Sequence, residues 1–448
     1  MARPIGIDLF AGAGGMSLGF EQAGFDVKVA VEIDPIHCVT HKFNFPDCAI
    51  ISKSVKEISA AEIRKAGGIG DATIDCVFGG PPCQGFSLIG HRTLDDPRNS
   101  LVLEFVRLVS ELGARSFVFE NVKGLTVGRH KAFLKELVET FEAVGYEVQL
   151  PPRVLNAASY GVPQKRERLI LFGVKKGEKL PTYPLPMTRF KGEADLVLAP
   201  APTCAEALGD LPNAEGYADL RATDAVVSNK WGNPSAYAKE LRCLTNDAWH
   251  FGHQRRWDPQ VLTSSWRTEH SYISRQRFEE TTPGEVEPIS RFFRLAAGGL
   301  SNTLRAGTDG ARGAFTSPRP IHYKYARCIT VREMARLHGY PDWFRLHGTK
   351  WHGARQVGNS VPPPMARAIG ASILRALGIR PVRSNKVKEL GDEALLAMEM
   401  SEAAAYCGVK APAQRRDRKS GAKKRSQTET ERERLRNRRR EAEHAELA

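Results

Sequence analysis

The sequence predicts an α/β protein with a mostly parallel sheet and a second, smaller domain that is rich in loops. Strand and helix patterns alternate over residues 1–178, which is typical of a parallel sheet. A glycine-rich loop follows the first strand directly, and hydrophobic periodicity fades between about residues 176 and 325. The chain of 448 residues is also too long for one compact core, so we expect at least two parts.

Apolar segments of strand length and amphipathic segments of helix length follow one another in order. We predict strands at 5–10, 27–31, 74–78, 117–119 and 169–172, and helical faces within 15–24, 101–112 and 133–141. Regular structure returns at a capping box, Thr330 to Glu333, whose helix ends at the turn 339–341. A final helix is predicted from Pro364 to Leu377, and 390–406 is a candidate for a short helix. The apolar stripes of these elements are assigned to the core.

The composition is that of a water-soluble globular protein, with 42% hydrophobic residues and a mean hydropathy of -0.35. No apolar run approaches the ~20 residues that a membrane-spanning helix needs, and we expect no leader peptide before the first strand. We therefore expect a cytoplasmic protein without membrane contact. The eight cysteines include no Cys-x-x-Cys pair and no zinc-finger spacing, so we expect free thiols and no metal site.

Positive charge is concentrated near the C-terminus. Residues 415–440 contain 13 Lys or Arg and 4 Asp or Glu, so they carry +9 of the formal net charge of +14. Such a composition is typical of a solvated arm, and we expect the charged segment 381–448 to form a largely disordered tail. A basic arm also attracts nucleic-acid phosphates in a salt-sensitive and sequence-independent way.

The first glycine-rich loop predicts a site for a nucleoside-containing cofactor. Phe10-x-Gly12-x-Gly14-Gly15 joins a strand to a helix, where free N–H groups and the helix dipole favour a polar ligand. Glu32 ends the next strand, 20 residues after Gly12, which is the position of an acid that binds ribose hydroxyls. This pattern suits NAD or S-adenosylmethionine. Ser17 stands where a dinucleotide fingerprint has its third glycine, which disfavours NAD.

Cys83 lies in a tight loop, Gly79-Gly80-Pro81-Pro82-Cys83-Gln84-Gly85-Phe86-Ser87, directly after an apolar strand. Two prolines fix the backbone before the cysteine, and the glycines allow a ligand to approach closely. The loop presents the thiol at the carboxyl end of a strand, where open α/β sheets bind their ligands. The context alone leaves a reactive thiol and a packing residue equally open.

Polar side chains at three other places are candidates for the same cleft. Glu120 ends the following strand, and a carboxyl there either hydrogen-bonds a ring nitrogen or caps a turn. Gln164, Arg166 and Arg168 precede the last strand and share one face, which also suits a solvated edge. Asn359 belongs to a turn before the last helix, where it either caps that helix or returns to the cleft.

These blocks, in this order, resemble the cytosine-5 DNA methyltransferase family. Seven of them match family motifs over 1–178 and 326–378: the loop 10–15, Glu32, Pro82-Cys83-Gln84, Glu120-Asn121-Val122, Gln164-x-Arg166-x-Arg168, the helix 330–341 and the turn 358–361. The resemblance implies a Rossmann-like fold that uses S-adenosylmethionine, in a bacterial restriction–modification enzyme. We expect a monomer in the bacterial cytoplasm or nucleoid.

The resemblance also implies the roles of individual residues. Cys83 would add to C6 of a cytosine flipped out of double-stranded DNA, Glu120 would bind N3 and the amino group, Arg168 would hold O2, and Arg166 would support the loop. S-adenosylmethionine would be held by Phe10, Gly12, Gly14, Gly15, Glu32, Pro82 and Asn359. DNA contacts are expected from Gln84 and Ser87. The loop 301–308, with Thr303 and Arg305, combines small hydroxyl residues, arginine and glycine, which suits contacts with base edges and phosphates. From its residues alone, this loop either reads the DNA or only braces its domain.

The resemblance divides the chain into four stretches. We expect a catalytic and cofactor-binding domain at 1–178, a target recognition domain at 179–325, a return segment at 326–380 that completes the catalytic domain, and the tail at 381–448. One position departs from the family. Where an aspartate commonly binds adenine, this chain has Ser54, so the adenine contact is left unassigned.

Three other functions stay open at this stage. An RNA cytosine-5 methyltransferase shares the architecture, although the long insert at 180–325 favours duplex DNA with a defined sequence. A catalytically inactive DNA-binding module would have no need of Cys83, Glu120, Arg166 and Arg168 together. A NAD-dependent oxidoreductase is the most distant alternative.

Overall fold

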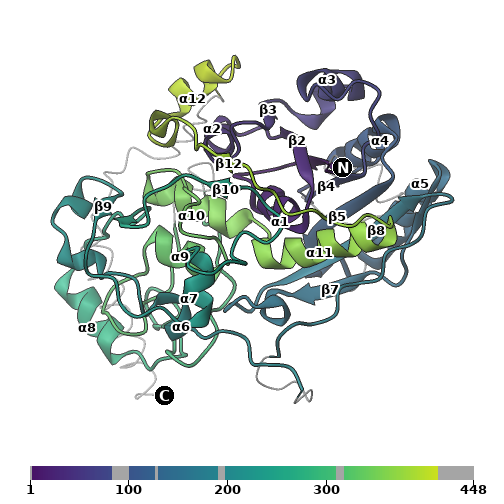
Figure 1. Cartoon of the computed structure of the whole chain (residues 1–448). Helices are drawn as coiled ribbons and strands as arrows, with labels where there is room; N and C mark the ends of the chain where they lie inside the picture. Colours follow the sequence, from purple (N-terminus) through teal and green to yellow (C-terminus); the bar gives the residue numbers. More distant parts are fainter. Residues whose placement is uncertain (1–2, 83–99, 127–129, 190–196, 309–316, 412–448) are drawn as a thin grey trace, which may run out of the picture.

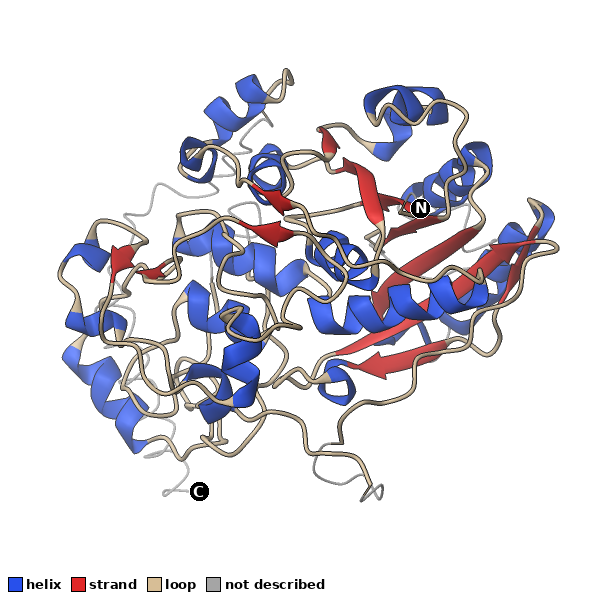
Figure 2. Ribbon diagram, viewed as in Figure 1, coloured by secondary structure: helices blue, strands red, loops and turns tan. Residues whose placement is uncertain are grey.

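A computed structural model of the chain describes residues 3–82, 100–126, 130–189, 197–308 and 317–411. It confirms the predicted α/β class, with helices on both sides of a central sheet and a loop-rich part beside it (Figure 1, Figure 2). Cys83, Gln84 and Ser87 lie outside the described residues, as does the basic stretch 415–440.

The sheet is mostly parallel and has the strand order β3-β2-β1-β4-β5-β8-β6, with β7 paired to β8. Its first five strands run parallel, whereas β8 runs antiparallel to β5, β6 and β7. The carboxyl ends of β1 to β5 therefore share one edge with the amino end of β8. The strands are β1 (Ile5–Leu9), β2 (Asp26–Val31), β3 (Ala49–Ile51), β4 (Cys76–Gly79), β5 (Ser116–Val122), β6 (Tyr146–Val148), β7 (Arg153–Asn156) and β8 (Glu167–Lys175).

Apolar side chains fill both faces of the sheet, as expected of buried parallel strands. Phe78 of β4 stacks on Phe20 of α1 with 3.8 Å between ring centroids, while the adjacent Val77 belongs to the opposite core. α1 (Gly15–Ala23) and α11 (Pro363–Ala376) cover the first face; α3 (Ala60–Ala66), α4 (Ser100–Leu112) and α5 (His130–Ala143) cover the second. None of the described helices is long and apolar enough to cross a bilayer.

α1 and α11 come from opposite ends of the chain and lie in close contact. A Cβ at Gly19 of α1 would lie 2.4 Å from Ala366 Cβ and 2.6 Å from Pro363 O. Only glycine fits at such separations, so Gly19 sets the distance between the helices. The predicted helix from Pro364 to Leu377 is found as α11, one residue earlier at each end.

The loop-rich part contains short helices and two-residue strands: α6 (Cys204–Leu208), β9 (Val226–Val227), α7 (Ala236–Leu241), β10 (Gln254–Arg255), β11 (Val261–Leu262), α8 (Tyr272–Glu280), α9 (Val331–Leu337) and α10 (Lys350–Asn359). The predicted capping box begins α9, where Thr330 and Glu333 bond reciprocally. Arg336 of α9 is buried in ion pairs with Asp210 at 2.9 Å and Asp342 at 2.6 Å. Because α9 packs on α6, the stretch 326–380 is shared by both parts, and α11 is its contribution to the sheet.

The expectation of disorder does not hold for 381–411. β12 (Val387–Lys388) pairs with β10, and α12 (Met400–Tyr406) packs on α2 (Pro35–Asn44). The physical reason is that leucines and alanines, spaced between the charged residues, are buried against α2. The high content of charged residues in the segment conceals this apolar face. The short helix expected within 390–406 is found as α12, preceded by a single turn at 393–396.

Gly19→Ala should destabilise the protein. The gain in helix propensity is about 1 kcal/mol, whereas overpacking against rigid backbone costs about 1–3 kcal/mol, so we expect a net loss of up to ~2 kcal/mol. Gly124→Ala is the matched control, because a Cβ there has no neighbour within 4 Å. Urea unfolding midpoints measure both, and equal midpoints for the two variants would contradict the close contact.

Candidate active site

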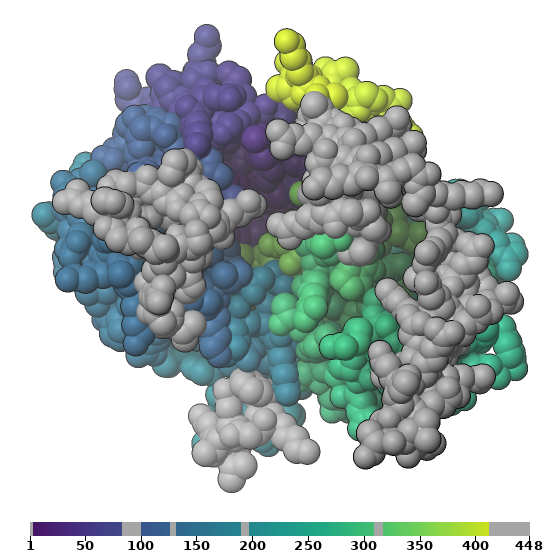
Figure 3. All heavy atoms as spheres, turned by 180° about the vertical axis from the view of Figure 1, so that it is seen from behind, coloured from purple at the N-terminus to yellow at the C-terminus, as the bar shows by residue number. Residues whose placement is uncertain are grey.

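One cavity of about 1010 Å3 opens at the edge of the sheet where β1, β2, β4 and β5 end. The surface is hollowed between the purple and blue N-terminal part and the green part (Figure 3). Among the predicted site residues, the following line the cavity: Phe10, Gly12, Gly15, Glu32, Pro82, Glu120, Arg168 and Asn359. The described residues Gly14, Arg166, Thr303 and Arg305 are not part of its lining. Pro82 is the last described residue before Cys83.

The loop after β1 owes its shape to positive φ angles at Phe10 (63°), Gly12 (56°) and Gly14 (100°). A Cβ at Gly12 would have no neighbour within 4 Å, so this glycine serves the turn and leaves space for a ligand. A Cβ at Gly14 would lie 2.5 Å from the ring of Phe45. Gly14 is therefore required by packing beneath the loop, and it does not face the cavity.

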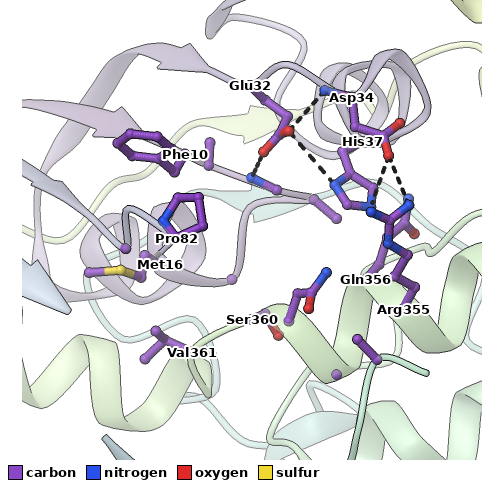
Figure 4. A pocket seen from close by; sticks show the side chains of 18 of the residues that line it. Phe10, Met16, Glu32, Asp34, His37, Pro82, Arg355, Gln356, Ser360 and Val361 are labelled. Atoms are coloured by element: carbon purple, nitrogen blue, oxygen red, sulfur yellow. Dashed lines mark hydrogen bonds and ion pairs between the residues drawn. The ribbon is translucent and has the colours of Figure 1, made fainter. Parts of the chain in front are cut away.

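Glu32 fastens two backbone turns to each other at the cavity wall (Figure 4). Its Oε2 accepts a hydrogen bond from Gly12 N at 2.8 Å, and its Oε1 accepts one from Asp34 N at 2.9 Å. A carboxylate has further lone pairs on both oxygens. The arrangement therefore fits the vicinal hydroxyls of a ribose.

α10 forms a wall across from α2, and an ion pair and a neutral hydrogen bond join the two stretches (Figure 4). Arg355 pairs with Asp34 at 3.2 Å, and Gln356 donates to Thr40 Oγ1 at 2.9 Å. Although burial opposes ionisation, the charges of His37 and Arg355 lower the pKa of Asp34. These contacts hold the cavity between two stretches that are far apart in the sequence.

Asn359 is the last residue of α10, and its side chain is exposed at the cavity. The next helix, α11, begins after Pro362 without a side-chain cap, so Asn359 is not its N-cap. A Cβ at Gly15 would lie 2.8 Å from Val361 O, which shows how closely this turn meets the start of α1.

Glu120 and Arg168 form an ion pair in the wall, with 2.8 Å between Oε1 and Nε. The antiparallel register sets Arg168 opposite Val122, two residues after Glu120. Because alternate residues of a strand share a face, the side chains of Arg168 and Glu120 stand on the same face of the sheet. Burial raises the pKa of Glu120, and the nearby Arg168 and Arg166 offset this only in part. A Cβ at Gly80 would lie 2.3 Å from Glu120 Oε2, so the absence of a side chain at Gly80 leaves room for the carboxylate beside the backbone. The pair can hold a proton and offer hydrogen bonds to a polar ring.

Arg166 is fully buried and acts on the backbone around the cavity. Its guanidinium donates to the carbonyls of Leu304 at 3.1 Å, Gly358 at 2.9 Å and Ser360 at 2.7 Å. Burial lowers its pKa to about 9. Arg166 thus ties the start of β8 to the loop 301–308 and to the turn 358–360.

The loop 301–308 docks on the same edge of the sheet. Thr303 Oγ1 donates to Lys165 O at 2.7 Å, and a Cβ at Gly358 would lie only 2.3 Å from Ala306 N. The side chains of Thr303 and Arg305 are exposed, whereas residues 306–308 line the cavity. Of the four residues predicted to contact DNA, Thr303 and Arg305 are therefore exposed and precede the lining residues in the chain.

Asp8 was not among the predicted site residues, yet it is 1% exposed and lines the cavity. It accepts a hydrogen bond of 2.6 Å from Ser17 Oγ. Burial raises the pKa of Asp8 to about 8, although this hydrogen bond lowers it. The sequence did contain a signal for this residue, because Asp8 is a carboxylate within an otherwise apolar strand of five residues. Ser54, by contrast, caps a single helical turn at 55–57 and lies outside the cavity lining.

The fold is that of a Rossmann-like α/β protein, and one cavity joins the Glu32 carboxylate to the Glu120–Arg168 pair. The sequence model for "C-5 cytosine-specific DNA methylase" matches residues 6–375. The chain belongs to this family, and it is a DNA (cytosine-5-)-methyltransferase.

Individual relatives agree with this assignment. The chain is 57% identical over 409 residues to the Type II methyltransferase M.XorII of Xanthomonas oryzae pv. oryzae, covering 91% of this chain and 93% of the relative. A prophage-encoded E. coli protein described as a DNA modification methyltransferase is 33% identical, with a TM-score of 0.66 over 84% of this chain and 99% of that one. S. pombe Dnmt2 methyltransferase, 15% identical with a TM-score of 0.50 over 84% of this chain and 100% of that one, shares the fold alone.

Asp8 should make stability fall with rising pH. Its pKa is about 8 in the folded protein and near 4 when unfolded, so the folded state holds the extra proton between these values. The stabilising contribution is complete below about pH 4 and is lost as the pH rises towards 8. Asp8→Asn, which retains an acceptor for Ser17, should flatten this dependence. Urea midpoints across that range test it, and parallel curves for both proteins would refute it.

Proposed function

We propose that this enzyme transfers a methyl group from S-adenosylmethionine to C5 of a cytosine flipped out of duplex DNA, through a transient bond between Cys83 and C6. The observation that carries the proposal is the shared cavity. The ribose-type site at Glu32 and the Glu120–Arg168 pair both face it, and its described wall runs to Pro82, immediately before Cys83.

The described residues fit the methyl donor. Gly12 leaves space beside Glu32, whose oxygens suit ribose hydroxyls, and Phe10 and Pro82 offer apolar surface for a base. Gly15 and Asn359 also line the cavity. Gly14 would act indirectly, by keeping the loop packed. When bound, S-adenosylmethionine supplies an electrophilic methyl group on a sulfonium.

The protein's task is to make C5 nucleophilic. Attack by the Cys83 thiolate on C6 forms an S–C bond and shifts the ring electrons to C5, which takes the methyl group. Loss of the C5 proton to a base then expels Cys83 and restores the ring. Glu120 would hydrogen-bond N3 and the amino group, and its raised pKa favours the proton-donating form. Arg168 would hold O2, while Arg166 is a positioning residue.

A base within a duplex cannot enter this cavity, so the cytosine must leave the stack at a cost of a few kcal/mol. Contacts from the recognition region, 179–325, would offset this cost and read flanking bases in the major groove. The side chains of Thr303 and Arg305 are exposed just before the lining residues 306–308, which suits this role. Gln84 and Ser87 would contact DNA from the Cys83 loop.

By analogy with its Type II relatives, we propose that the methylation protects DNA from a partner restriction endonuclease. Bisulfite sequencing of DNA from expressing cells would report the modified base and its sequence context together. Methylation at cytosines without a common flanking sequence would contradict a restriction–modification role.

Cys83→Ser should reduce methyl transfer to duplex DNA to background, because a hydroxyl is a far poorer nucleophile than a thiolate for this addition. S-adenosylhomocysteine should still bind within about threefold of the wild-type affinity. Transfer of tritiated methyl groups and calorimetry measure the two effects. Cys243→Ala, a half-buried cysteine outside the cavity, is the control. Substantial turnover by the serine variant would remove the covalent mechanism.

Glu120→Gln should lower kcat by a factor of about 10²–10⁴, while the Kd for DNA changes by less than threefold. In the wild type, the rate should fall as the pH rises through the raised pKa of Glu120, since the neutral acid is the donor; the variant should lack this decline. Glu167→Gln, which alters an exposed pair with Lys123, is the matched control. Comparable losses in catalysis and DNA binding would make Glu120 structural.

A further inference from the structure

The family match ends at residue 375, yet the described chain continues as a C-terminal segment, 376–411, that is fastened to the cofactor side of the molecule. β12 of this segment pairs with β10, and Lys388 pairs with Asp47 at 3.0 Å. Gly391 N donates to Phe43 O of α2 at 2.8 Å. In Figure 3 the yellow part of this segment lies at the top, beside purple N-terminal residues.

The segment covers α2, the helix that follows Glu32. Ile36, Val39 and Phe43 of α2 form one buried apolar cluster with Leu395, Leu396 and Ala403 of the segment. At the same interface the thiol of Cys407 contacts that of Cys38, which in turn donates to Glu32 O at 3.3 Å. The C-terminal segment therefore packs directly behind the residues that form the ribose-type site.

Met400 is the residue of this segment that reaches the cavity. It is the first residue of α12, and a capping box between Glu399 and Glu402 fixes the start of that helix. Among the described residues after 375, Met400 alone belongs to the cavity lining. Its side chain is half-buried, so apolar surface remains open there. Ile33, which is 65% exposed and follows Glu32, adds further apolar surface to the wall.

We infer that Met400 is a cofactor-binding residue that packs against the adenosine portion of S-adenosylmethionine, an inference that rests on the proposed function. A thioether is polarizable and flexible, so it adapts to the face or edge of an aromatic ring. Ile33 and Met400 both line the cavity, so a purine placed beyond the ribose site would meet apolar surface there. The C-terminal segment, which lies beyond the family match, thus supplies part of the cofactor site.

Calorimetry with S-adenosylhomocysteine on the full chain tests this contact. Met400→Ala should raise the Kd about tenfold, while kcat at saturating donor and KM for DNA stay within twofold. Met400→Leu, which conserves apolar volume, should restore binding to within about threefold. Met400→Gln keeps the length but not the apolar end, so it reports on the contact if the alanine variant unfolds.

Met398→Ala is the matched control, because Met398 packs on the same cluster but does not line the cavity. It should lower the melting temperature and leave the Kd unchanged. Unaltered binding by the alanine and glutamine variants at position 400, or an equal loss in Met398→Ala, would overturn the proposed contact. Failure of the wild type to bind S-adenosylhomocysteine would instead overturn the proposed function, and the contact with it.

Discussion

The cavity depends on a buried arginine. Arg166 has no exposed surface, and its three backbone acceptors belong to Leu304, Gly358 and Ser360, which lie 138 to 194 residues away along the chain. A buried guanidinium is costly unless its donors are satisfied, so these carbonyls must converge whenever the protein folds. The requirement brings the loop 301–308 and the turn 358–360 to the amino end of β8. Both stretches then face the ends of the parallel strands, which is why one cavity has walls from distant parts of the chain.

A second polar network reinforces this junction and works only with a neutral histidine. Gln164 Oε1 accepts from Leu304 N, so its amide nitrogen donates to His338 Nδ1 at 2.9 Å. The Nε2–H of His338 is then free to donate to Ser360. A charged imidazole would offer Gln164 no acceptor. Burial and the adjacent Arg166 both lower the pKa of His338, which keeps it in the form that the network needs.

The sequence was most informative where the signal is local. The strand, loop and helix at residues 5–24, the capping box at Thr330 and the acid at Glu32 follow from short patterns. The structure brings Glu32, Glu120 and Arg168 to one cavity. Signals that depend on packing were missed. Gly14 reads as a ligand-binding glycine but is required by Phe45, and Asp8 reads as part of an apolar strand. The many charged residues of 381–411 concealed an apolar face that is buried against α2. That face consists of a few spaced apolar residues, which composition alone does not reveal.

The Glu120–Arg168 pair shows how the fold sets the chemistry of the cavity. An exposed carboxylate beside an arginine would be fully ionised, whereas an isolated buried one would stay protonated well above neutral pH. Here burial is the larger influence and Arg168 opposes it, so the pKa of Glu120 rises less than burial alone would raise it. The balance requires antiparallel β8 beside parallel β5, since only this register sets Arg168 on the face of Glu120 at the open edge. A parallel strand in the position of β8 would present its carboxyl end there and leave Arg168 at the opposite edge, so the reversal of this one strand is what supplies the cleft with its arginine.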